Sequence, residues 1–243
     1  MKIKTDKNIK SLKSNWKFDK SVAKNFDSHV TKSVPLYGVS HDLCISLSEF
    51  FLKENGRCYD IGCSNGSLLN KIKVKNAKKK LNLIGIDNSK PMISLAKKKY
   101  KNISFKNAHL ENFSFLKSDL VLSLYTIQFL KPKYRQDLFN KIYKSLNWGG
   151  AFVLFEKIRA DDARFQDIMT FLYFDFKSQN GLDSSEILNK EISLRSVLEP
   201  YTIQANMDYL KRAGFKDVMP ISQYLNFKGF LAIKWSYILN FFK

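Results

Sequence analysis

The stretch Tyr59-Asp60-Ile61-Gly62-Cys63-Ser64-Asn65-Gly66-Ser67 decides how the rest of the chain is interpreted. An apolar lead-in runs into an acidic residue, two glycines bracket a tight bend, and Leu68, Leu69 and Ile72 begin a helical repeat. This pattern predicts a strand, a glycine turn and a helix. Glycine permits positive φ and a close approach of a ligand, and free N–H groups at a helix start suit a polar ligand. We therefore expect a small cofactor at this bend.

A second acidic residue ends the next expected strand, which spans residues 81–87. The spacing of Gly62 and Gly66 is not that of the dinucleotide-binding pattern. Asp87 nevertheless stands at the end of the second strand, where the carboxylate that accepts hydrogen bonds from ribose hydroxyls is found in nucleotide-binding folds. The pair of motifs favours a nucleoside-bearing ligand over an ordinary loop.

Strand patterns alternate with helical patterns along most of the chain. Strands are expected to begin near 57 and to span 81–87, 103–105, 119–124 and 151–156. This alternation predicts an α/β, Rossmann-like fold with a mostly parallel seven-stranded sheet and right-handed crossovers. Two β-rich runs, 217–225 and 227–235, predict a C-terminal antiparallel hairpin.

The remaining segments define the domain organisation. Residues 1–15 are interpreted as a flexible basic arm and residues 16–235 as a single domain. Apolar positions at helical spacing from 16 to 30 predict an N-terminal helical flank. A helical insertion at about 161–209, rich in aromatic residues, is expected to cover the site, and residues 236–243 form an apolar tail.

The cysteine content and the distribution of apolar residues argue against a disulfide-rich or membrane-spanning protein and indicate a cellular compartment. The three cysteines, Cys44, Cys58 and Cys63, are too few and too irregular for a disulfide framework or a zinc site, which favours a reducing cytoplasm. The first residues are polar and lysine-rich rather than leader-like, and the most apolar stretch, 230–242, contains Lys234 and is too short for a membrane span.

The net charge of +19 suits a polyanionic partner such as RNA or a membrane surface. The lysines are scattered, however, and aromatic residues do not interleave with them as stacking platforms would. A solvated basic surface is therefore the favoured interpretation, and direct nucleic-acid binding stays open without being favoured.

At this point the motifs resemble the class I S-adenosylmethionine (SAM) methyltransferase fold, and within it the carboxy-S-adenosylmethionine synthase family. The resemblance runs from about Trp16 to Lys234. The matching segments are Phe18-Asp19, Val22-Ala23, Phe26-Asp27, Ser33-Val34-Pro35-Leu36-Tyr37, Tyr59-Asp60-Ile61-Gly62-Cys63-Ser64, Ile86-Asp87-Asn88-Ser89, Met92, Tyr125-Thr126-Ile127-Gln128-Phe129-Leu130, Asn147, Gly149-Gly150, Glu156-Lys157, Asp175-Phe176-Lys177 and Gly181.

The resemblance implies a reaction in which SAM and prephenate give carboxy-SAM and phenylpyruvate, with carbon dioxide captured by a sulfonium ylide, in the service of tRNA wobble-uridine modification. A bound nucleoside would be SAM, carboxy-SAM or S-adenosylhomocysteine. The resemblance also suggests a homodimer, with the aromatic insertion as a candidate interface.

The resemblance assigns roles to residues at the expected cofactor site. Tyr37 would reach the cofactor from the flank, and Asp60, Gly62, Cys63 and Ser64 would lie along its methionine part. Asp87 with Asn88 would bind ribose and adenine, and His109 and Leu110 would lie near the adenine. No metal ligand set is expected, and His29 and His41 are interpreted as structural residues.

Three positions depart from the family pattern. His109 stands where the family has an acid, and Leu124 stands where it has an asparagine. Glu191 aligns with the family arginine that holds the new carboxylate. Arg195, one helical turn later, is the candidate to replace that arginine, as is Lys190.

Two other function classes remain at this stage. One is a conventional SAM-dependent methyltransferase acting on a small metabolite. The other is a non-catalytic scaffold associated with RNA or a membrane, which the charge and the apolar tail would suit.

Overall fold

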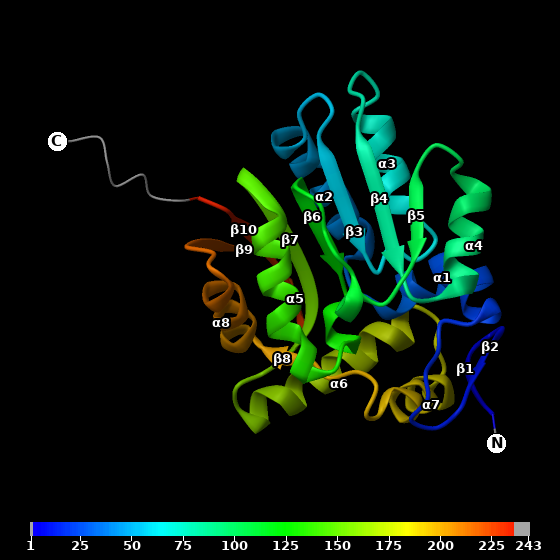
Figure 1. The fold of residues 1–243 in the computed structure, drawn as a ribbon. Coiled ribbons are helices and arrows are strands. Elements are labelled where there is room, and N and C mark those ends of the chain that lie inside the picture. The colour runs from blue at the N-terminus through cyan, green and yellow to red at the C-terminus, as the bar shows by residue number, and fades with distance from the viewer. Residues whose placement is uncertain (1, 236–243) are drawn as a thin grey trace.

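The computed structural model describes residues 2–235, and these form a central sheet with helices on both faces (Figure 1). The strands are β1 (Ile3–Asp6), β2 (Ile9–Ser11), β3 (Arg57–Ile61), β4 (Asn82–Asp87), β5 (Ser104–Asn107), β6 (Ser118–Leu124), β7 (Leu146–Arg159), β8 (Tyr201–Thr202), β9 (Asp217–Tyr224) and β10 (Phe227–Ile233). The α-helices are α1 (Lys20–Ser33), α2 (Tyr37–Phe51), α3 (Ser67–Lys75), α4 (Lys90–Lys99), α5 (Pro132–Ser145), α6 (Ala163–Gln179), α7 (Ser184–Leu194) and α8 (Ile203–Ala213). Two short 3₁₀ helices are η1 (Leu110–Asn112) and η2 (Ile127–Phe129).

The central sheet has the order β5-β4-β3-β6-β7-β10-β9, and β8 pairs with β7 at one end. Strands β3 to β7 are parallel, whereas β10 is antiparallel to both β7 and β9. The predicted α/β class, with a mostly parallel sheet and a C-terminal antiparallel hairpin, is confirmed. The two-residue β8 makes the sheet eight-stranded.

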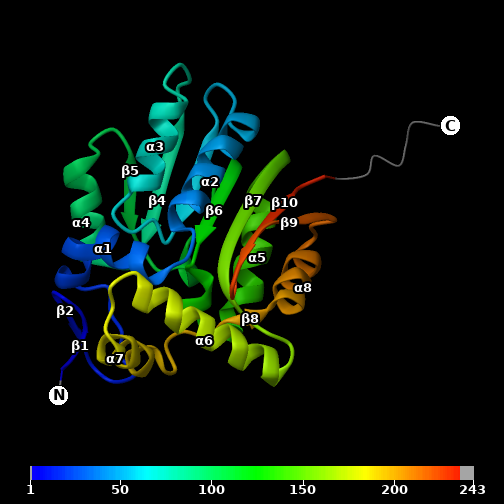
Figure 2. The same ribbon diagram turned by 180° about the vertical axis from the view of Figure 1, so that it is seen from behind.

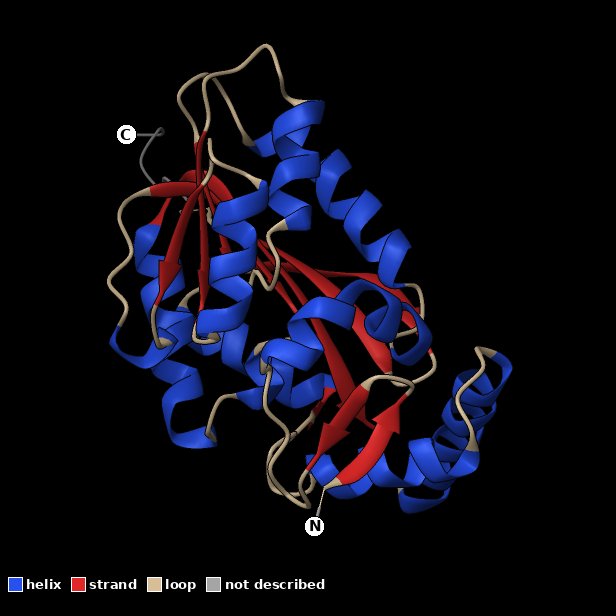
Figure 3. Cartoon of the chain, turned by 90° about the vertical axis from the view of Figure 1, so that its right-hand side faces the viewer, coloured by secondary structure: helices blue, strands red, loops and turns tan. Residues whose placement is uncertain are grey.

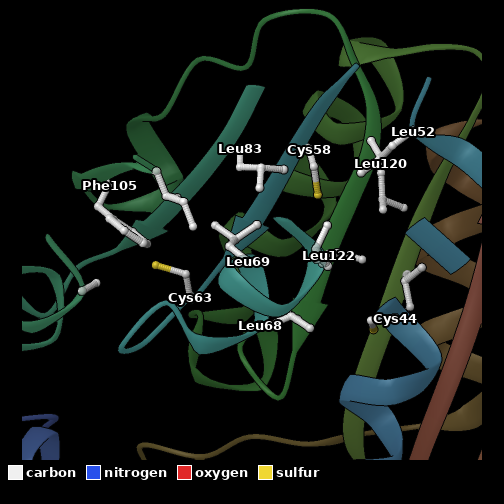
Figure 4. Packing of buried hydrophobic residues seen from close by; sticks show 14 of the residues in the cluster. Cys44, Leu52, Cys58, Cys63, Leu68, Leu69, Leu83, Phe105, Leu120 and Leu122 are labelled. Carbon is white, nitrogen blue, oxygen red and sulfur yellow. The ribbon is translucent and has the colours of Figure 1, made fainter. Parts of the chain in front are cut away.

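Alternating side chains bury both faces of the sheet. On β7, Ala151, Val153 and Phe155 pack toward α2, α3 and α4, whereas Phe152 and Leu154 pack toward α5 and α8. Figures 1 and 2 show these two helix layers on opposite sides of the strands, and Figure 4 shows the packing on the first face. A strand buried on both faces is apolar at consecutive positions, as 151–155 is.

The strand order creates a crevice at one edge of the sheet. The chain moves outward from β3 to β4 and β5, then returns to form β6 on the other side of β3. A parallel sheet that reverses its order in this way has a cleft outside the carboxyl ends of the two strands at the reversal. Helices α1, α6 and α7 lie across this edge in Figures 1 and 2.

The predicted flexible arm is instead a small hairpin, so that prediction is wrong for the described residues from 2 onward. Strands β1 and β2 pair antiparallel, and Figure 3 shows them beside the N-terminus, apart from the central sheet. Thr5 and Ile9 are buried, and the Asn189 amide on α7 donates to the Lys4 carbonyl oxygen. The segment has few apolar residues and packs on a helix far along the chain, so the sequence gives little signal of it.

Two other boundaries differ from expectation. Helix α1 begins at Lys20 because the Asp19 side chain caps it by accepting the N–H groups of Ser21 and Val22. Strand β7 begins at Leu146, earlier than the expected 151, and its N-terminal part includes Gly149, whose φ is 71°.

The apolar tail 236–243 lies outside the described residues. Among residues 2–235, no helix is both long and apolar enough to cross a membrane.

Candidate functional site

A cavity of about 240 Å³ occupies the crevice at the carboxyl ends of β3, β4 and β6. Its walls come from α1, α2, the turn after β3, the 3₁₀ segments, β7, α6 and α7. Its lining includes the polar and aromatic side chains of Trp16, His29, Ser33, Tyr37, His41, Asp60, Ser64, Asp87, Asn88, Glu111, Tyr125, Thr126, Lys157, Tyr173 and Lys190. The cavity therefore joins the glycine turn to the helices that cover the sheet edge.

The glycine turn after β3 is held against its neighbouring strands. The Gly62 N–H donates to the Ile86 carbonyl oxygen at 2.7 Å, and Gly62 has a φ of 73°. A Cβ on Gly62 would lie 2.0 Å from Thr126 Oγ1. Position 62 therefore admits only glycine, because both its backbone conformation and the close approach of Thr126 exclude a side chain.

Asp87, at the end of β4, is tied to the same turn. One carboxylate oxygen accepts the Ser64 N–H at 3.0 Å, and the other accepts the Ser89 N–H at 2.7 Å. Burial raises the pKa of Asp87, although these two hydrogen bonds act to lower it. Each carboxylate oxygen keeps further acceptor capacity, which suits the two hydroxyls of a ribose.

Asp60 lies at the end of β3 with only 3% of its surface exposed. Burial, and to a smaller degree the charge of Asp87, raises the pKa of Asp60 to about 7. A cationic ligand beside these two carboxylates would favour their ionised forms. This end of the cavity, called here the carboxylate end and defined by Asp60 and Asp87, is therefore suited to a cation.

Aromatic side chains form a wall beside the carboxylate end. The ring centroids of Tyr37 and His41 are 4.4 Å apart, and those of Tyr37 and Tyr125 are 6.2 Å apart. Burial raises the pKa of Tyr37 and lowers the pKa of His41 to about 4, so both rings are neutral near pH 7. Leu124, at the end of β6, adds an apolar contact to the lining.

The segment that carries Tyr125 is positioned by a buried carboxylate on β7. Glu156 accepts the backbone N–H groups of Ile127 and Gln128 at 3.0 and 2.7 Å. Burial raises the pKa of Glu156 to about 8, although nearby Arg135 and these N–H groups lower it. Glu156 does not line the cavity, and its place in the molecule is to fix the backbone that does.

Lysines from three different elements form a second charged region of the site, called here the lysine end and defined by Lys157, Lys177 and Lys190. Lys157 and Lys190 line the cavity, while Lys177 Nζ is 2.7 Å from Glu191 Oε1 and 4.0 Å from the centre of the Tyr173 ring. Burial lowers the pKa of Lys157 to about 8 and that of Lys190 well below its ordinary value. An anionic ligand would favour the charged forms of both.

Most of the residues predicted for the site meet at this cavity. The structure places in the lining Tyr37, Asp60, Gly62, Cys63, Ser64, Asp87, Asn88 and Leu110. The Cys63 thiol itself packs into the core beside Phe105 (Figure 4), and burial raises its pKa. The backbone of Cys63, rather than its sulfur, is thus what the turn presents.

Two predicted residues lie outside the cavity lining. His109 is exposed at the N-cap of η1, and the neighbouring lining residue with an acidic side chain is Glu111. Arg195 is exposed at the C-cap of α7, so the structure does not bring it to the cavity. The Glu191 carboxylate pairs with Lys177, and the α7 residues that line the cavity are Lys190 and Leu194.

Sequence reasoning missed several lining residues. His29, interpreted as structural, lines the cavity, as do Trp16 and Lys157. Lys157 belongs to the matching segment Glu156-Lys157, and Trp16 is the residue at which the resemblance begins, so the resemblance was the available signal for both. The acid that contacts His29 is Asp6, which is 23 positions away, so this pairing gave no local sequence pattern.

The residues present fit a SAM-like ligand. The turn at Gly62 leaves no side chain between the ligand and the backbone, Asp87 offers acceptors to a ribose, and Asp60 offers a buried negative charge to a cation. Among the described residues, no group of histidine, cysteine and acidic side chains is arranged to hold a metal ion.

Comparison with known proteins agrees with this geometry. Residues 59–150 match the family described as "Methyltransferase domain". Among solved structures, a SAM-dependent methyltransferase of Methanococcus maripaludis, described as putative in its title, aligns with a TM-score of 0.60 at 20% identity, covering 94% of this chain and 99% of that one. Human N-acetylserotonin methyltransferase in complex with SAM aligns with a TM-score of 0.62 at 16% identity, covering 90% and 57%. At such identities these structures bear on the fold alone, which is that of class I methyltransferases.

Curated relatives are much closer in sequence. The carboxy-S-adenosyl-L-methionine synthase of Campylobacter lari is 37% identical over 229 residues, covering 93% of this chain and 97% of the relative. The protein of the same name from Campylobacter jejuni strain 81-176 is 40% identical over 228 residues, covering 92% and 96%. With such identity over nearly its whole length, and with a SAM-type crevice, the chain belongs to the carboxy-S-adenosyl-L-methionine synthase family of SAM-dependent transferases.

Proposed function

We propose that this protein makes carboxy-SAM from SAM, with prephenate as the source of the carboxyl group. Phenylpyruvate and water are the other products, because prephenate loses its ring hydroxyl together with the carboxyl group, and the departing hydroxide takes the proton that the SAM methyl group gives up. The observation that carries the proposal is the opposite charge of the two ends of one cavity. The carboxylate end suits a cation that bears a nucleoside, and the lysine end suits an organic anion. A methyltransferase for a neutral metabolite would have no need of two buried lysines in the lining.

At the carboxylate end, the chain's own residues would hold SAM through its sugar and its charged part. Asp87 would accept the ribose hydroxyls while Asp60 faces the positive charges of the methionine part. Glu111, which lines the cavity next to Leu110, would take the place of the acid that the family has at position 109. Leu124 would replace the family asparagine with an apolar contact.

At the lysine end, Lys157 and Lys190 would hold the carboxylate in place of the family arginine. Glu191 stands at that arginine's position, but its carboxylate is paired with Lys177 at 2.7 Å. This ion pair removes the repulsion that a free carboxylate at position 191 would exert on an anion. Lys157 and Lys190 then remain as positive groups in the lining, and Arg195 has no part in the proposal.

The reaction requires the protein to position the two substrates and to exclude water from the cavity. When bound, SAM supplies a sulfonium whose attached methyl group has acidic hydrogens. The protein would set the anion beside that methyl group and exclude water, with Tyr37, Tyr125 and Tyr173 as the aromatic walls. Fixed charges in such a water-poor cavity act more strongly than they would in solution.

The direct test is incubation of the purified protein with SAM and prephenate, followed by mass spectrometry. We expect carboxy-SAM and phenylpyruvate in equal amounts, and neither product when prephenate is omitted. Formation of S-adenosylhomocysteine without carboxy-SAM would point to methyl transfer instead. Absence of both products, under conditions where calorimetry shows SAM bound, would refute the proposal.

We also propose that the protein is a homodimer. Helix α6 exposes four apolar side chains that recur at helical spacing, namely Phe165, Ile168, Phe171 and Leu172. Such a row on one helix face would be covered if α6 packed against a second copy. Light scattering should give twice the chain mass for the wild type and a lower mass for Phe171→Lys. Val74→Lys, at an exposed residue of α3, is the control that should leave the mass unchanged.

We propose that the product serves tRNA wobble-uridine modification and that the protein is cytoplasmic. The three cysteines are buried and unpaired, as suits a reducing compartment.

A further inference from the structure

Two buried polar atoms on α1 lack a hydrogen-bond partner among the described residues. They are His29 Nε2 and Ser33 Oγ, on side chains whose residues are 5% and 7% exposed. Both residues line the cavity, and they lie one helical turn apart, hence on the same face of α1. Leaving such a buried group unpaired destabilises a protein, because the group loses its hydrogen bonds to water and gains none in exchange. A ligand bound in the cavity could supply the missing hydrogen-bond partner of each atom.

The ring of His29 is fixed by its neighbours. His29 Nδ1 lies 2.7 Å from Asp6 Oδ2, and the ring stacks on Trp16 with centroids 5.6 Å apart. Asp6 is also 3.7 Å from Lys32 Nζ, and its hydrogen bond with His29 lowers the Asp6 pKa to about 2. Asp6 is therefore ionised and accepts the Nδ1 proton.

This arrangement leaves a hydrogen-bond acceptor in the cavity. Burial lowers the pKa of His29, and the nearby charges of Lys190 and Lys177 act in the same direction, although Asp6 opposes them. The imidazole is therefore neutral near pH 7, with its proton on Nδ1 and a lone pair on Nε2. A group that donates a hydrogen bond, such as a hydroxyl, is the complement of Nε2.

An amino group, which an anionic ligand would hold in its charged form, completes the set. Lys190 Nζ lies over the ring of Trp16, 2.6 Å from its centre, and Trp16 in turn stacks on His29. Lys190, Trp16 and His29 thus form a contiguous wall of the cavity, drawn from α7, the segment before α1, and α1 itself. An acceptor, a hydroxyl and an ammonium group together suit a ligand that carries both a hydroxyl and a carboxylate.

We propose that His29 Nε2, Ser33 Oγ and Lys190 Nζ form the subsite that selects a hydroxyl-bearing organic anion as the second substrate. His29 Nε2 accepts a hydrogen bond from the hydroxyl of the ligand. The Ser33 hydroxyl forms a second hydrogen bond with the hydroxyl-bearing end of the ligand, and Lys190 binds a carboxylate of the ligand. The inference rests on the proposed function and adds the residues that determine specificity for the second substrate.

The test measures ligand binding by calorimetry on the full chain saturated with S-adenosylhomocysteine, so that no turnover occurs. The probes are prephenate, which has a ring hydroxyl, and phenylpyruvate, which has none. We expect Ser33→Ala to weaken prephenate binding about fivefold and His29→Phe about tenfold, as the loss of one hydrogen bond predicts. Phenylpyruvate binding should change less than twofold in both variants.

Ser33→Ala has a readout that a merely structural serine would not give. Because it deletes an unpaired buried hydroxyl, it should leave the thermal midpoint unchanged or raise it while binding weakens. Ser123→Ala is the matched control, since Ser123 Oγ is also buried and unpaired among the described residues but lies outside the cavity lining. That control should bind both probes as the wild type does.

Wild-type affinity of Ser33→Ala for prephenate would overturn the inference, and so would an equal loss for both probes. His29→Phe leaves Asp6 without its partner and can fail to fold, in which case Ser33→Ala alone decides. If the variants lose prephenate as expected but the wild type makes no carboxy-SAM, the proposed function fails and the subsite stands. If the wild type makes carboxy-SAM while the variants bind normally, the subsite fails alone.

Discussion

The two ends of the cavity are built in different ways. Asp60 and Asp87 end adjacent strands, and the short turn between β3 and α3 ties them together through the Ser64 N–H. Lys157 comes from β7, whereas Lys177 and Lys190 come from helices that cross the sheet edge later in the chain. One end is thus a local motif on a rigid sheet, and the other is assembled from distant segments.

The two ends share one electrostatic principle with opposite sign. Burial raises the pKa of Asp60 and lowers that of Lys157, so each group is held near the point at which it would lose its charge. A ligand of opposite charge reverses both effects. We therefore propose that the cavity receives a cation at the carboxylate end and an anion at the lysine end.

The largest effect is expected at the lysine end. Lys190→Met should lower kcat/KM for prephenate about 100-fold, because a charge-assisted hydrogen bond to a carboxylate is lost in a water-poor cavity. The affinity for SAM should change less than twofold. Lys98→Met removes the same charge from an exposed site on α4 and should leave both quantities unchanged. Equal losses in SAM and prephenate binding would mean that the two ends are not separate.

The carboxylate end should show the converse behaviour. Asp87→Ala is expected to weaken SAM binding about tenfold or more in calorimetry, through loss of charge-assisted hydrogen bonds to the ribose. Asp137→Ala, in an exposed ion pair with Lys141, is the control. An unchanged SAM affinity in Asp87→Ala would remove Asp87 from the site.

The pH dependence of binding should separate the ends without a mutation. A SAM cation binds the ionised form of Asp60, so SAM affinity should rise about tenfold between pH 6 and 8, as protonation of a group with a pKa of about 7 is lost. An anion binds the protonated form of Lys157, so prephenate affinity should fall as the pH rises through about 8. Asp60→Asn should remove the pH dependence of SAM affinity, and Lys157→Met should remove that of prephenate affinity. An unchanged pH profile in either variant would mean that another group is responsible for that titration.

The smallest effect concerns the ion pair behind the lysine end. Glu191→Gln leaves the buried Lys177 ammonium without its carboxylate, and we expect the free energy of unfolding to fall by about 1 kcal/mol. Urea denaturation measures this loss. Glu49→Gln, which breaks an exposed pair with Lys75, should have a smaller effect. A Glu191→Gln variant as stable as the wild type would show that Lys177 does not depend on Glu191.

The accuracy of the sequence predictions follows the same division. The continuous apolar run of β7 and the turn at Gly62 could be predicted because each depends on residues within a few positions of one another. The role expected of Arg195 could not be checked in this way, because spacing along a helix does not say which residues face a cavity. In the structure α7 turns Lys190 toward the cavity and leaves Arg195 exposed at its C-cap.

The α/β sheet, the glycine turn and the acidic residues at the ends of β3 and β4 could be predicted from the sequence alone, because apolar strand runs, helix period and turn chemistry are local properties of the chain. The rest of the cavity depends on long-range packing: the pairing of Asp6 with His29, the contact of the β1–β2 hairpin with α7, and the convergence of the lysines. Those contacts join residues that are far apart in the chain, and the path of the intervening segments, set by packing against the sheet edge, fixes which of them meet.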